Sequence, residues 1–203
     1  MYEKYFKRFL DIIICIIVLP VFLIIFIILG ILIKIEDGGP ILYVADRIGK
    51  DSKIFKMYKF RSMKVNSPNI LNKDGSTYNA KDDFRVTKVG KFIRETSIDE
   101  TAQIINVLKG DMSIIGPRAS LADALSTYKE DELDKMLVRP GISGYTQAYY
   151  RNGLSVREKR LKDSWYSNNV TFRLDLKIIL KTIITVFRQD GIYTMDKENN
   201  ENL

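Results

Sequence analysis

Two adjacent acids, Asp99 and Glu100, are the side chains of this sequence whose position best suits chemistry. Ser97 stands three residues before Glu100, which is the spacing of a capping box at the start of a helix. Apolar residues then recur with helical spacing until Gly110, a residue type that commonly ends helices. The pattern predicts a helix over residues 98–109 with Asp99 in its first turn, where the helix dipole favours an ionised carboxylate.

Acids in the first turn of a helix usually serve stability alone. Composition nevertheless narrows the chemistry: the 203 residues include no histidine, which excludes histidine-assisted nucleophiles and histidine-bound metals. The single cysteine, Cys15, lies in an apolar stretch, and one cysteine cannot build a disulfide framework or a cysteine zinc site. Acid, base and metal-binding duties therefore fall mainly to carboxylates, and an aspartate can itself act as a nucleophile.

Basic residues are abundant in the chain and stand on both sides of the acidic pair in the sequence. Lysine and arginine number 32 against 25 acids, and the formal charge of +7 indicates an anionic partner such as phosphate, lipid headgroups or nucleic acid. Arg85 and Arg94 precede the pair, and a glycine-containing turn that ends in Arg118 follows it. Arginine can hold a phosphate through two parallel hydrogen bonds, although pairing with the two acids is the simpler role for these side chains.

An apolar segment precedes the rest of the chain. Residues 12–33 carry no charge, and a bilayer span takes about 20 apolar residues. Basic residues flank both ends of the segment, which favours a cytoplasmic location for both ends. Pro20 removes a backbone donor near its middle. We therefore expect a re-entrant helix–break–helix within residues 1–35 that dips into one leaflet and returns, with a single-pass span as the alternative.

The segments after the anchor predict short elements joined by loops. Apolar and aromatic runs at 41–44 and 54–60 predict a β-hairpin, and the polar segment 66–82 predicts a mobile surface loop. Charge-rich residues 121–137 favour a solvated helix, and the proline and glycines of 139–145 favour a turn.

Near the end of the chain, residues 173–188 predict an amphipathic basic helix that suits either the core or an anionic membrane surface. The predicted fold is mainly α with a small β-hairpin, comprising a re-entrant anchor (1–35), interfacial helices around a compact cytoplasmic catalytic domain (36–192), and a disordered tail (193–203). Amphipathic aromatics gather in the second half and favour packing, a membrane-interface belt or a base-stacking wall: Tyr145, Tyr149, Tyr150, Trp165 and Tyr166.

With these segments in view, the chain resembles the small monotopic phosphoglycosyl transferases, the bacterial sugar transferase family that begins lipid-linked glycan assembly. The resemblance extends over about residues 4–192. Each of its motifs is weak alone, but together and in this order they are highly specific: residues 7–11, 58–63, 83–87, 94–100, 106–113, 116–118, 139–144, 151–152 and 174–177.

The chain departs from the family pattern at three positions. Leu19 replaces the serine that usually precedes the membrane-break proline, so no hydroxyl is available there to satisfy freed backbone groups. Ala119 replaces the second proline of the Pro-Arg-Pro turn, and Tyr145 stands where tryptophan is common. None of these changes touches the acidic pair.

The resemblance implies a two-step transfer. Asp99 would attack the β-phosphorus of a UDP-sugar, releasing UMP, and polyprenol phosphate would then take the phosphosugar from the enzyme. An N-acetylated amino sugar is the family-level expectation for the donor. The resemblance also implies Mg²⁺ held by Asp99 and Glu100, with Glu100 as a base or a metal support, at the cytoplasmic face of the bacterial inner membrane.

The same resemblance implies roles for further residues. Arg94 and Arg118 would hold phosphates, and Arg151 would lie on the nucleotide side. Lys59 and Asp175 would orient the acidic pair or the metal. Phosphoryl transfer needs neutralisation of spread negative charge more than acid–base chemistry, which suits arginines and Mg²⁺ in a protein without histidine.

Other functions stay open on the sequence alone. A UDP-sugar hydrolase is the nearest alternative, because water could replace the lipid phosphate at the covalent intermediate. A membrane-anchored adaptor for anionic lipid would explain the charge and the apolar segment, but it predicts neither the acidic pair nor the turn at Arg118. A nucleic-acid binder would leave the apolar segment without a purpose.

Overall fold

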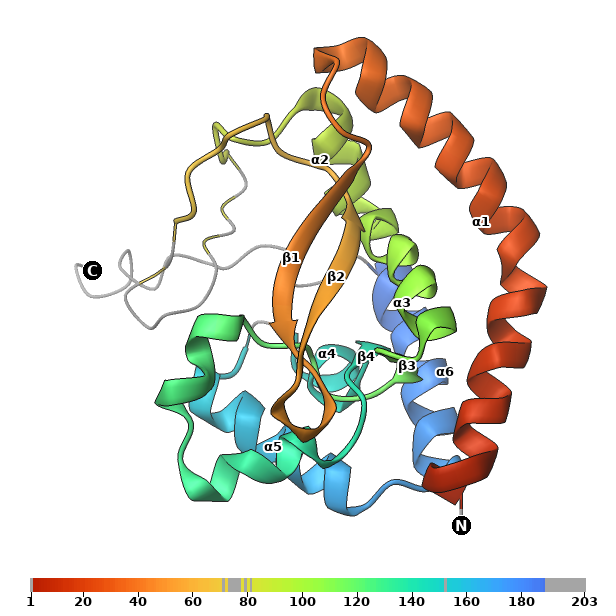
Figure 1. The fold of residues 1–203 in the computed structure, drawn as a ribbon, viewed down its shortest axis with the longest axis vertical. Helices are drawn as coiled ribbons and strands as arrows, with labels where there is room; N and C mark the ends of the chain where they lie inside the picture. Colours follow the sequence, from red (N-terminus) through yellow and green to blue (C-terminus); the bar gives the residue numbers. More distant parts are fainter. Residues whose placement is uncertain are drawn as a thin grey trace.

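The computed structural model describes residues 2–70, 72, 78, 80, 82–151 and 153–188 (Figure 1). The described chain is mostly helical, as predicted. In chain order, with η for 3₁₀- and π-helices, its elements are η1 (Tyr2–Phe6), α1 (Lys7–Asp37), β1 (Leu42–Ile48), η2 (Lys50–Ser52), β2 (Ile54–Phe60), α2 (Lys88–Glu95), η3 (Ile98–Gln103), α3 (Ile104–Lys109), β3 (Ser113–Ile115), η4 (Ala122–Thr127), η5 (Glu130–Leu137), β4 (Gly141–Ser143), α4 (Tyr145–Tyr149), α5 (Val156–Asn168) and α6 (Phe172–Arg188).

The predicted β-hairpin is confirmed. β1 and β2 pair antiparallel, in a register that runs from Leu42 opposite Phe60 to Ile48 opposite Ile54. The predicted helix near the end of the chain is confirmed as α6. The segment 66–82 lies partly, and the tail 193–203 entirely, outside the described residues.

A second, parallel sheet was not predicted. β3 and β4 pair with Ser113 opposite Gly141. β4 lies within the segment 139–145, for which the sequence predicted a turn. The backbones approach so closely that a Cβ on Gly141 would lie 2.1 Å from the nitrogen of Gly116. Glycine is therefore required here because no side chain would fit.

The helix α1 corrects the prediction of a break. It continues without interruption through Pro20, and Figure 1 shows it as one bowed helix along the side of the molecule. A proline removes one hydrogen bond and pushes away the preceding turn, and a long helix can absorb this as a bend. By length and composition α1 could cross a membrane.

One stripe of α1 packs against the rest of the protein. Cys15, Phe22, Leu29 and Ile33 are buried in the main hydrophobic core, where Phe22 contacts Phe60 of β2. These positions lie on one side of a helix because their spacings approximate whole turns. The opposite face is apolar yet exposed, a pattern that suits contact with lipid: Ile16, Ile17, Val21, Ile24, Ile27, Ile28, Ile31 and Ile35.

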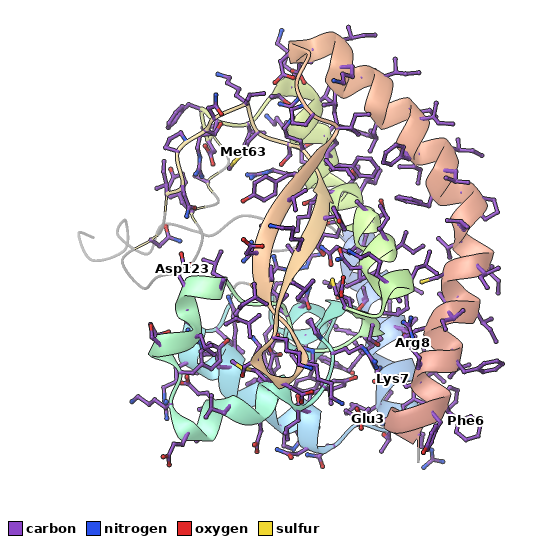
Figure 2. The ribbon with its side chains drawn as sticks, in the orientation of Figure 1. Glu3, Phe6, Lys7, Arg8, Met63 and Asp123 are labelled. Carbon is purple, nitrogen blue, oxygen red and sulfur yellow. The ribbon has the colours of Figure 1, made fainter. Side chains whose placement is uncertain are left out.

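Polar contacts fasten the first turns of α1. Lys7 forms a buried ion pair with Asp175 of α6, and Figure 2 labels Lys7 and Arg8 at this end of α1. Arg8 donates to the backbone oxygen of Val107 at 2.5 Å, near the end of α3, and Asp11 accepts from the backbone N–H of Ile114 at 3.0 Å. The N-terminal end of α1 is therefore fixed to α3, β3 and α6.

The other end of α1 is fastened as well. Asp37 pairs with the guanidinium of Arg61, which follows β2. Glu36 accepts from the backbone N–H of Lys88 at 2.6 Å, at the first turn of α2, where an acid is favoured by the helix dipole. Both ends of α1 thus contact the same folded domain.

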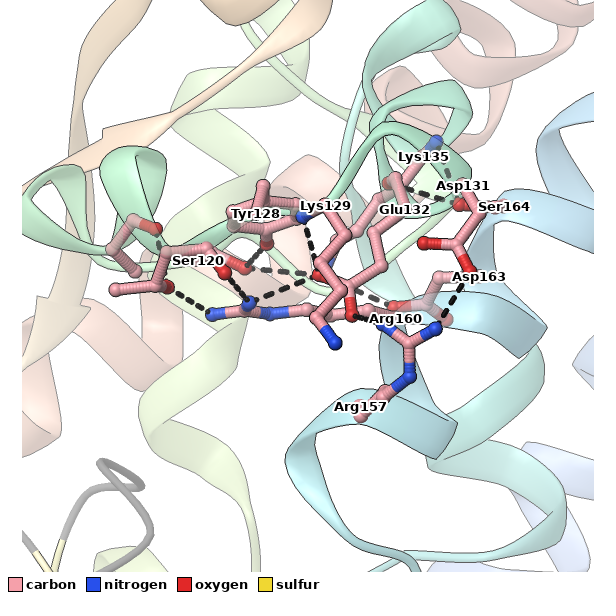
Figure 3. A network of polar contacts seen from close by, with 12 residues as sticks. Ser120, Tyr128, Lys129, Asp131, Glu132, Lys135, Arg157, Arg160, Asp163 and Ser164 are labelled. Carbon is pink, nitrogen blue, oxygen red and sulfur yellow. Dashed lines mark hydrogen bonds and ion pairs between the residues drawn. The ribbon is translucent and has the colours of Figure 1, made fainter.

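The charged segment 121–137 also differs from its prediction. It forms two short 3₁₀-helices, η4 and η5, instead of one helix. Buried Glu132 on η5 accepts from Arg157 at 2.8 Å and from Arg160 at 3.1 Å, both on α5 (Figure 3). The local charges therefore serve contacts between elements, which sequence periodicity does not reveal.

Candidate active site

The acidic pair begins a helix, but not through the predicted capping box. Ser97 has a left-handed backbone (φ 56°), and its side chain makes no capping hydrogen bond. Asp99 and Glu100 lie in the 3₁₀-helix η3, and the predicted α-helix exists only from Ile104 onward, as α3. Gly110 ends α3 with a left-handed backbone, as predicted.

Lys59 and Arg118 converge on the pair. Lys59 Nζ lies 2.8 Å from Glu100 Oε1 and 3.5 Å from Asp99 Oδ2. Arg118 Nη1 lies 3.2 Å from the same Glu100 oxygen. β2 supplies Lys59, and the turn after β3 supplies Arg118, so segments distant in sequence meet here.

The two acids differ in proton affinity. Burial raises the pKa of Asp99, repulsion by Glu100 adds to this, and the attraction of Lys59 opposes it. Burial would also raise the pKa of Glu100, but the charges of Lys59 and Arg118 outweigh it and lower that pKa to about 2. Glu100 is therefore the fixed anion. Asp99 is the more basic carboxylate, because burial outweighs the charges that favour its ionised form.

Arg94 adds a third positive charge that acts on Asp99. Its charge lowers the pKa of Asp99, although less than Lys59 and Arg118 do, and its Nε donates to Ser62 Oγ at 3.0 Å. Thr87 begins the short helix α2 that carries Arg94, and its side-chain oxygen accepts from Gly90 N–H. The structure therefore brings together Lys59, Arg94 and Arg118 around the acidic pair.

A buried acid that sequence reasoning missed supports Arg118. Asp163 of α5 accepts a hydrogen bond from the backbone N–H of Arg118. The carboxylate also accepts from Thr146 at 2.8 Å and pairs with Lys135 at 3.2 Å. Lys135 in turn donates to Ser120 at 3.1 Å, and Figure 3 shows this network between η5 and α5. Only the three-dimensional arrangement identifies Asp163 as the support of the Arg118 turn.

Two predicted site residues lie elsewhere. Asp175 is buried against Lys7, and it accepts from Tyr2 at 2.8 Å and Tyr166 at 2.6 Å. The expectation that Asp175 orients the acidic pair is therefore wrong, because its carboxylate joins α1 to α6. Arg151 has a left-handed backbone and donates to the backbone oxygen of Thr185 on α6 at 2.6 Å.

The aromatic residues divide between two environments. Tyr166 is fully buried. Tyr145, Tyr149 and Trp165 instead form a cluster of aromatic rings, in which the ring centroids of Tyr145 and Trp165 are 5.0 Å apart. Tyr149 and Trp165 are exposed, and Lys181 lies 5.9 Å from the Tyr149 ring. Tyr145 directly follows Gly144. A Cβ added to Gly144 would lie 2.0 Å from the backbone oxygen of Gly116, in the turn that leads to Arg118.

The acidic pair offers two carboxylates that suit Mg²⁺. Among the described residues no group of three or more acids, histidines or cysteines is arranged to hold a metal. Mg²⁺ commonly binds one or two carboxylates together with substrate phosphates. Asp99 fits such a site because its ion pair with Lys59 is long, at 3.5 Å, whereas a Glu100 oxygen already contacts two cations.

A helix that is long and apolar enough to cross a membrane thus packs against the domain that holds the carboxylate pair and its cations. The model of the bacterial sugar transferase family matches residues 2–189, and the chain belongs to that family.

Several curated proteins are similar to this chain. The undecaprenyl-phosphate galactose phosphotransferase of Salmonella typhimurium is 38% identical, over 94% of this chain and 42% of that protein. The UDP-N-acetylgalactosamine-undecaprenyl-phosphate N-acetylgalactosaminephosphotransferase of Aeromonas hydrophila is 38% identical, over 92% and 45%. The uncharacterized sugar transferase EpsL of Bacillus subtilis is 37% identical, over 92% and 89%. The chain thus spans less than half of the first two relatives and most of the third.

Proposed function

We propose that this protein transfers a sugar-1-phosphate from a UDP-sugar to polyprenol phosphate. In the first step an Asp99 oxygen forms a bond to the β-phosphorus, and the bond from that phosphorus to the bridging oxygen breaks, so that UMP leaves. In the second step a phosphate oxygen of polyprenol phosphate attacks the same phosphorus. The Asp99 carboxylate is released, and the product is a polyprenyl-diphosphate-linked sugar.

The difference between the two acids supports this proposal most directly. Burial raises the pKa of Asp99 and makes it the better nucleophile once it is ionised, whereas Glu100 stays charged and holds Lys59 and Arg118 in place. In this proposal Arg94 and Arg118 bind phosphate oxygens, whose spread charge dominates the transition state of phosphoryl transfer. Mg²⁺ bound at Asp99 with the donor phosphates would neutralise part of that charge.

We propose that α1 enters and leaves the membrane on one face. The contacts of Arg8 with α3 and of Glu36 with α2 fix both ends of α1 to one domain. A perpendicular span would require that domain to lie within the bilayer beside it. A bowed helix with its apolar face in one leaflet instead places Asp99 near the headgroups, where the acceptor phosphate lies. The basic flanks favour the cytoplasmic face of the inner membrane.

Labelling tests this topology. A Cys15→Ala background would receive one new cysteine in place of Tyr5 or of Ile35, which are both exposed near the ends of α1. In spheroplasts, a membrane-impermeant maleimide should label neither site until the membrane is opened. Labelling of one site and not the other from the outside would establish a span.

The chemistry has a direct test. The purified protein is incubated with a UDP-sugar and Mg²⁺ but without polyprenol phosphate, and its intact mass is measured. A phosphosugar adduct should appear, map to Asp99, and be absent in Asp99→Asn. Transfer at the parent rate by Asp99→Ala would exclude the nucleophile. Release of sugar phosphate without a lipid acceptor, at a rate equal to transfer, would favour a hydrolase.

The donor sugar is a separate proposal. We propose an N-acetylated amino sugar, and the Aeromonas relative carries such a sugar in its name, whereas the Salmonella relative is named for galactose. Adduct formation compared across UDP-N-acetylglucosamine, UDP-N-acetylgalactosamine, UDP-glucose and UDP-galactose would decide. The expected result is a faster reaction with the two N-acetylated donors.

A further inference from the structure

Arg47 is a half-buried arginine of β1 that forms no ion pair within the described part of the chain. Its Nε is buried and has no hydrogen-bond partner among the described residues. Burial of this N–H without a partner costs free energy that no contact between the described residues offsets. A buried polar group without a partner in a native fold is rare and calls for a ligand or a function.

The surroundings of Arg47 are those of the proposed active site. Its pKa is lowered, first by burial and then by the nearby charge of Arg118, while Tyr43 and Glu100 act weakly in the opposite direction. No ion pair joins Arg47 to Glu100 among the described residues, and the Glu100 oxygen Oε1 contacts Lys59 at 2.8 Å and Arg118 at 3.2 Å. Two guanidiniums, those of Arg47 and Arg118, are therefore close enough to repel each other.

The backbone fixes this arrangement. Arg47 forms an isolated β-bridge with Leu121, and the N–H of Ile48 donates to the backbone oxygen of Ser120 at 2.9 Å. β1 is thus held beside the segment that immediately follows Arg118. The two arginines are supplied by neighbouring backbone segments, so their proximity does not depend on one flexible side chain.

We propose that Arg47 binds a phosphate oxygen of the donor diphosphate, beside Arg118 and on the Glu100 side of the site. This assignment rests on the proposed function, because it takes the nucleotide diphosphate as the anion. An anion with two charges would neutralise both guanidiniums, and a guanidinium offers phosphate two parallel N–H groups. Water could satisfy the buried Nε, but it would leave the charge uncompensated.

Substrate binding and stability should respond to Arg47 in opposite directions. The Arg47→Met variant retains most of the apolar stem and removes the charge. In the absence of nucleotide its melting temperature should equal or exceed that of the parent, because a buried N–H without a partner has been removed. A structural role for Arg47 would lower the melting temperature instead.

The test uses the full chain in detergent with Asp99→Asn as the parent, so that no phosphoryl group is transferred. UDP is the probe, and calorimetry in the presence of Mg²⁺ gives its affinity. Arg47→Met should weaken UDP binding by at least about tenfold, the usual scale for one lost charge-assisted hydrogen bond. The UDP affinity of Arg47→Lys should lie between those of the parent and Arg47→Met, because lysine keeps the charge but lacks the two parallel N–H donors of a guanidinium. Lys53→Met, an exposed charge on the same hairpin, is the matched control and should bind as the parent does.

The outcomes separate this inference from the proposed function. Equal UDP affinity for Arg47→Met and Lys53→Met would overturn the role of Arg47. This holds even if the protein that retains Asp99, here called the Asp99 chain, forms its phosphosugar adduct. A clear drop in the melting temperature of nucleotide-free Arg47→Met would also overturn it, since the guanidinium would then have a structural partner. Absence of both UDP binding in the parent and adduct formation in the Asp99 chain would reject the proposed function itself, and this inference with it.

Discussion

Lys59 Nζ lies 2.8 Å from Glu100 Oε1, and the same ammonium reaches toward Asp99 at 3.5 Å. One cation thus serves two acids and lowers the pKa of each. Lys59 therefore sets the pH below which the acids lose their charge, in addition to any contact with substrate.

Replacement of Lys59 should move the pH dependence of transfer. In Lys59→Met the pKa of both acids rises, so the ionised Asp99 that attacks phosphorus is lost at a higher pH. The acidic limb of the rate profile should shift upward by about one pH unit or more, the scale of effect of a nearby opposite charge. Lys59→Arg keeps the charge and should keep the limb near its original position. Activity measured from pH 5 to 9 checks this, and an unshifted limb in Lys59→Met would contradict it.

Glu100 should contribute stability that depends on pH. Its pKa in the folded protein is about 2, below the ordinary 4.5, so its charge stabilises the fold at neutral pH. That contribution should be lost as the pH falls from about 4.5 toward 2. Glu100→Gln should therefore unfold at lower denaturant concentration than the parent at pH 7, and the difference should shrink at pH 4 and 3. A difference that stays constant across this range would show that Glu100 is not the fixed anion.

Asp163 should act on the reaction through Arg118. Asp163→Asn leaves Lys135 buried without its anion, and breaking a buried ion pair costs about 3–5 kcal/mol. Denaturant unfolding should show this loss. At a temperature where the variant stays folded, transfer should also slow because the Arg118 turn loosens. Asp46→Asn, which breaks an exposed pair with Lys56, is the control and should cost at most about 1 kcal/mol.

The parts of the fold that the sequence predicts are those with a local period. The β-hairpin and α6 follow from alternating and helical patterns. β3 and β4 have three residues each, too few for a pattern, and they pair across a long stretch of chain. Ser97 has the spacing of a capping residue, but its backbone is left-handed and its side chain makes no capping hydrogen bond. Spacing alone cannot reveal this backbone conformation.

The site was predicted only in part for a similar reason. Residue type and order indicated Asp99, Glu100, Lys59 and Arg118, and the structure brings all of them together. Asp175 stands in a motif as prominent as theirs, yet its partner is decided by the packing of α1 against α6. Whether such a charge contacts the acidic pair or another element depends on how the chain folds, and the order of the residues does not reveal this.

Asp175 and Lys7 should therefore behave as a unit that fastens the membrane helix. Each side chain is buried, so Asp175→Asn or Lys7→Met alone leaves one charge unpaired, at a cost of about 3–5 kcal/mol. The double variant removes both charges and should lose much less than the sum of the two single losses. Unfolding of the four chains in detergent, the parent included, gives the coupling energy. Because the pair lies outside the acidic site, the pH profile of transfer by the double variant should match the parent. A shift of the acidic limb of that profile would instead show that Asp175 acts on the acidic pair.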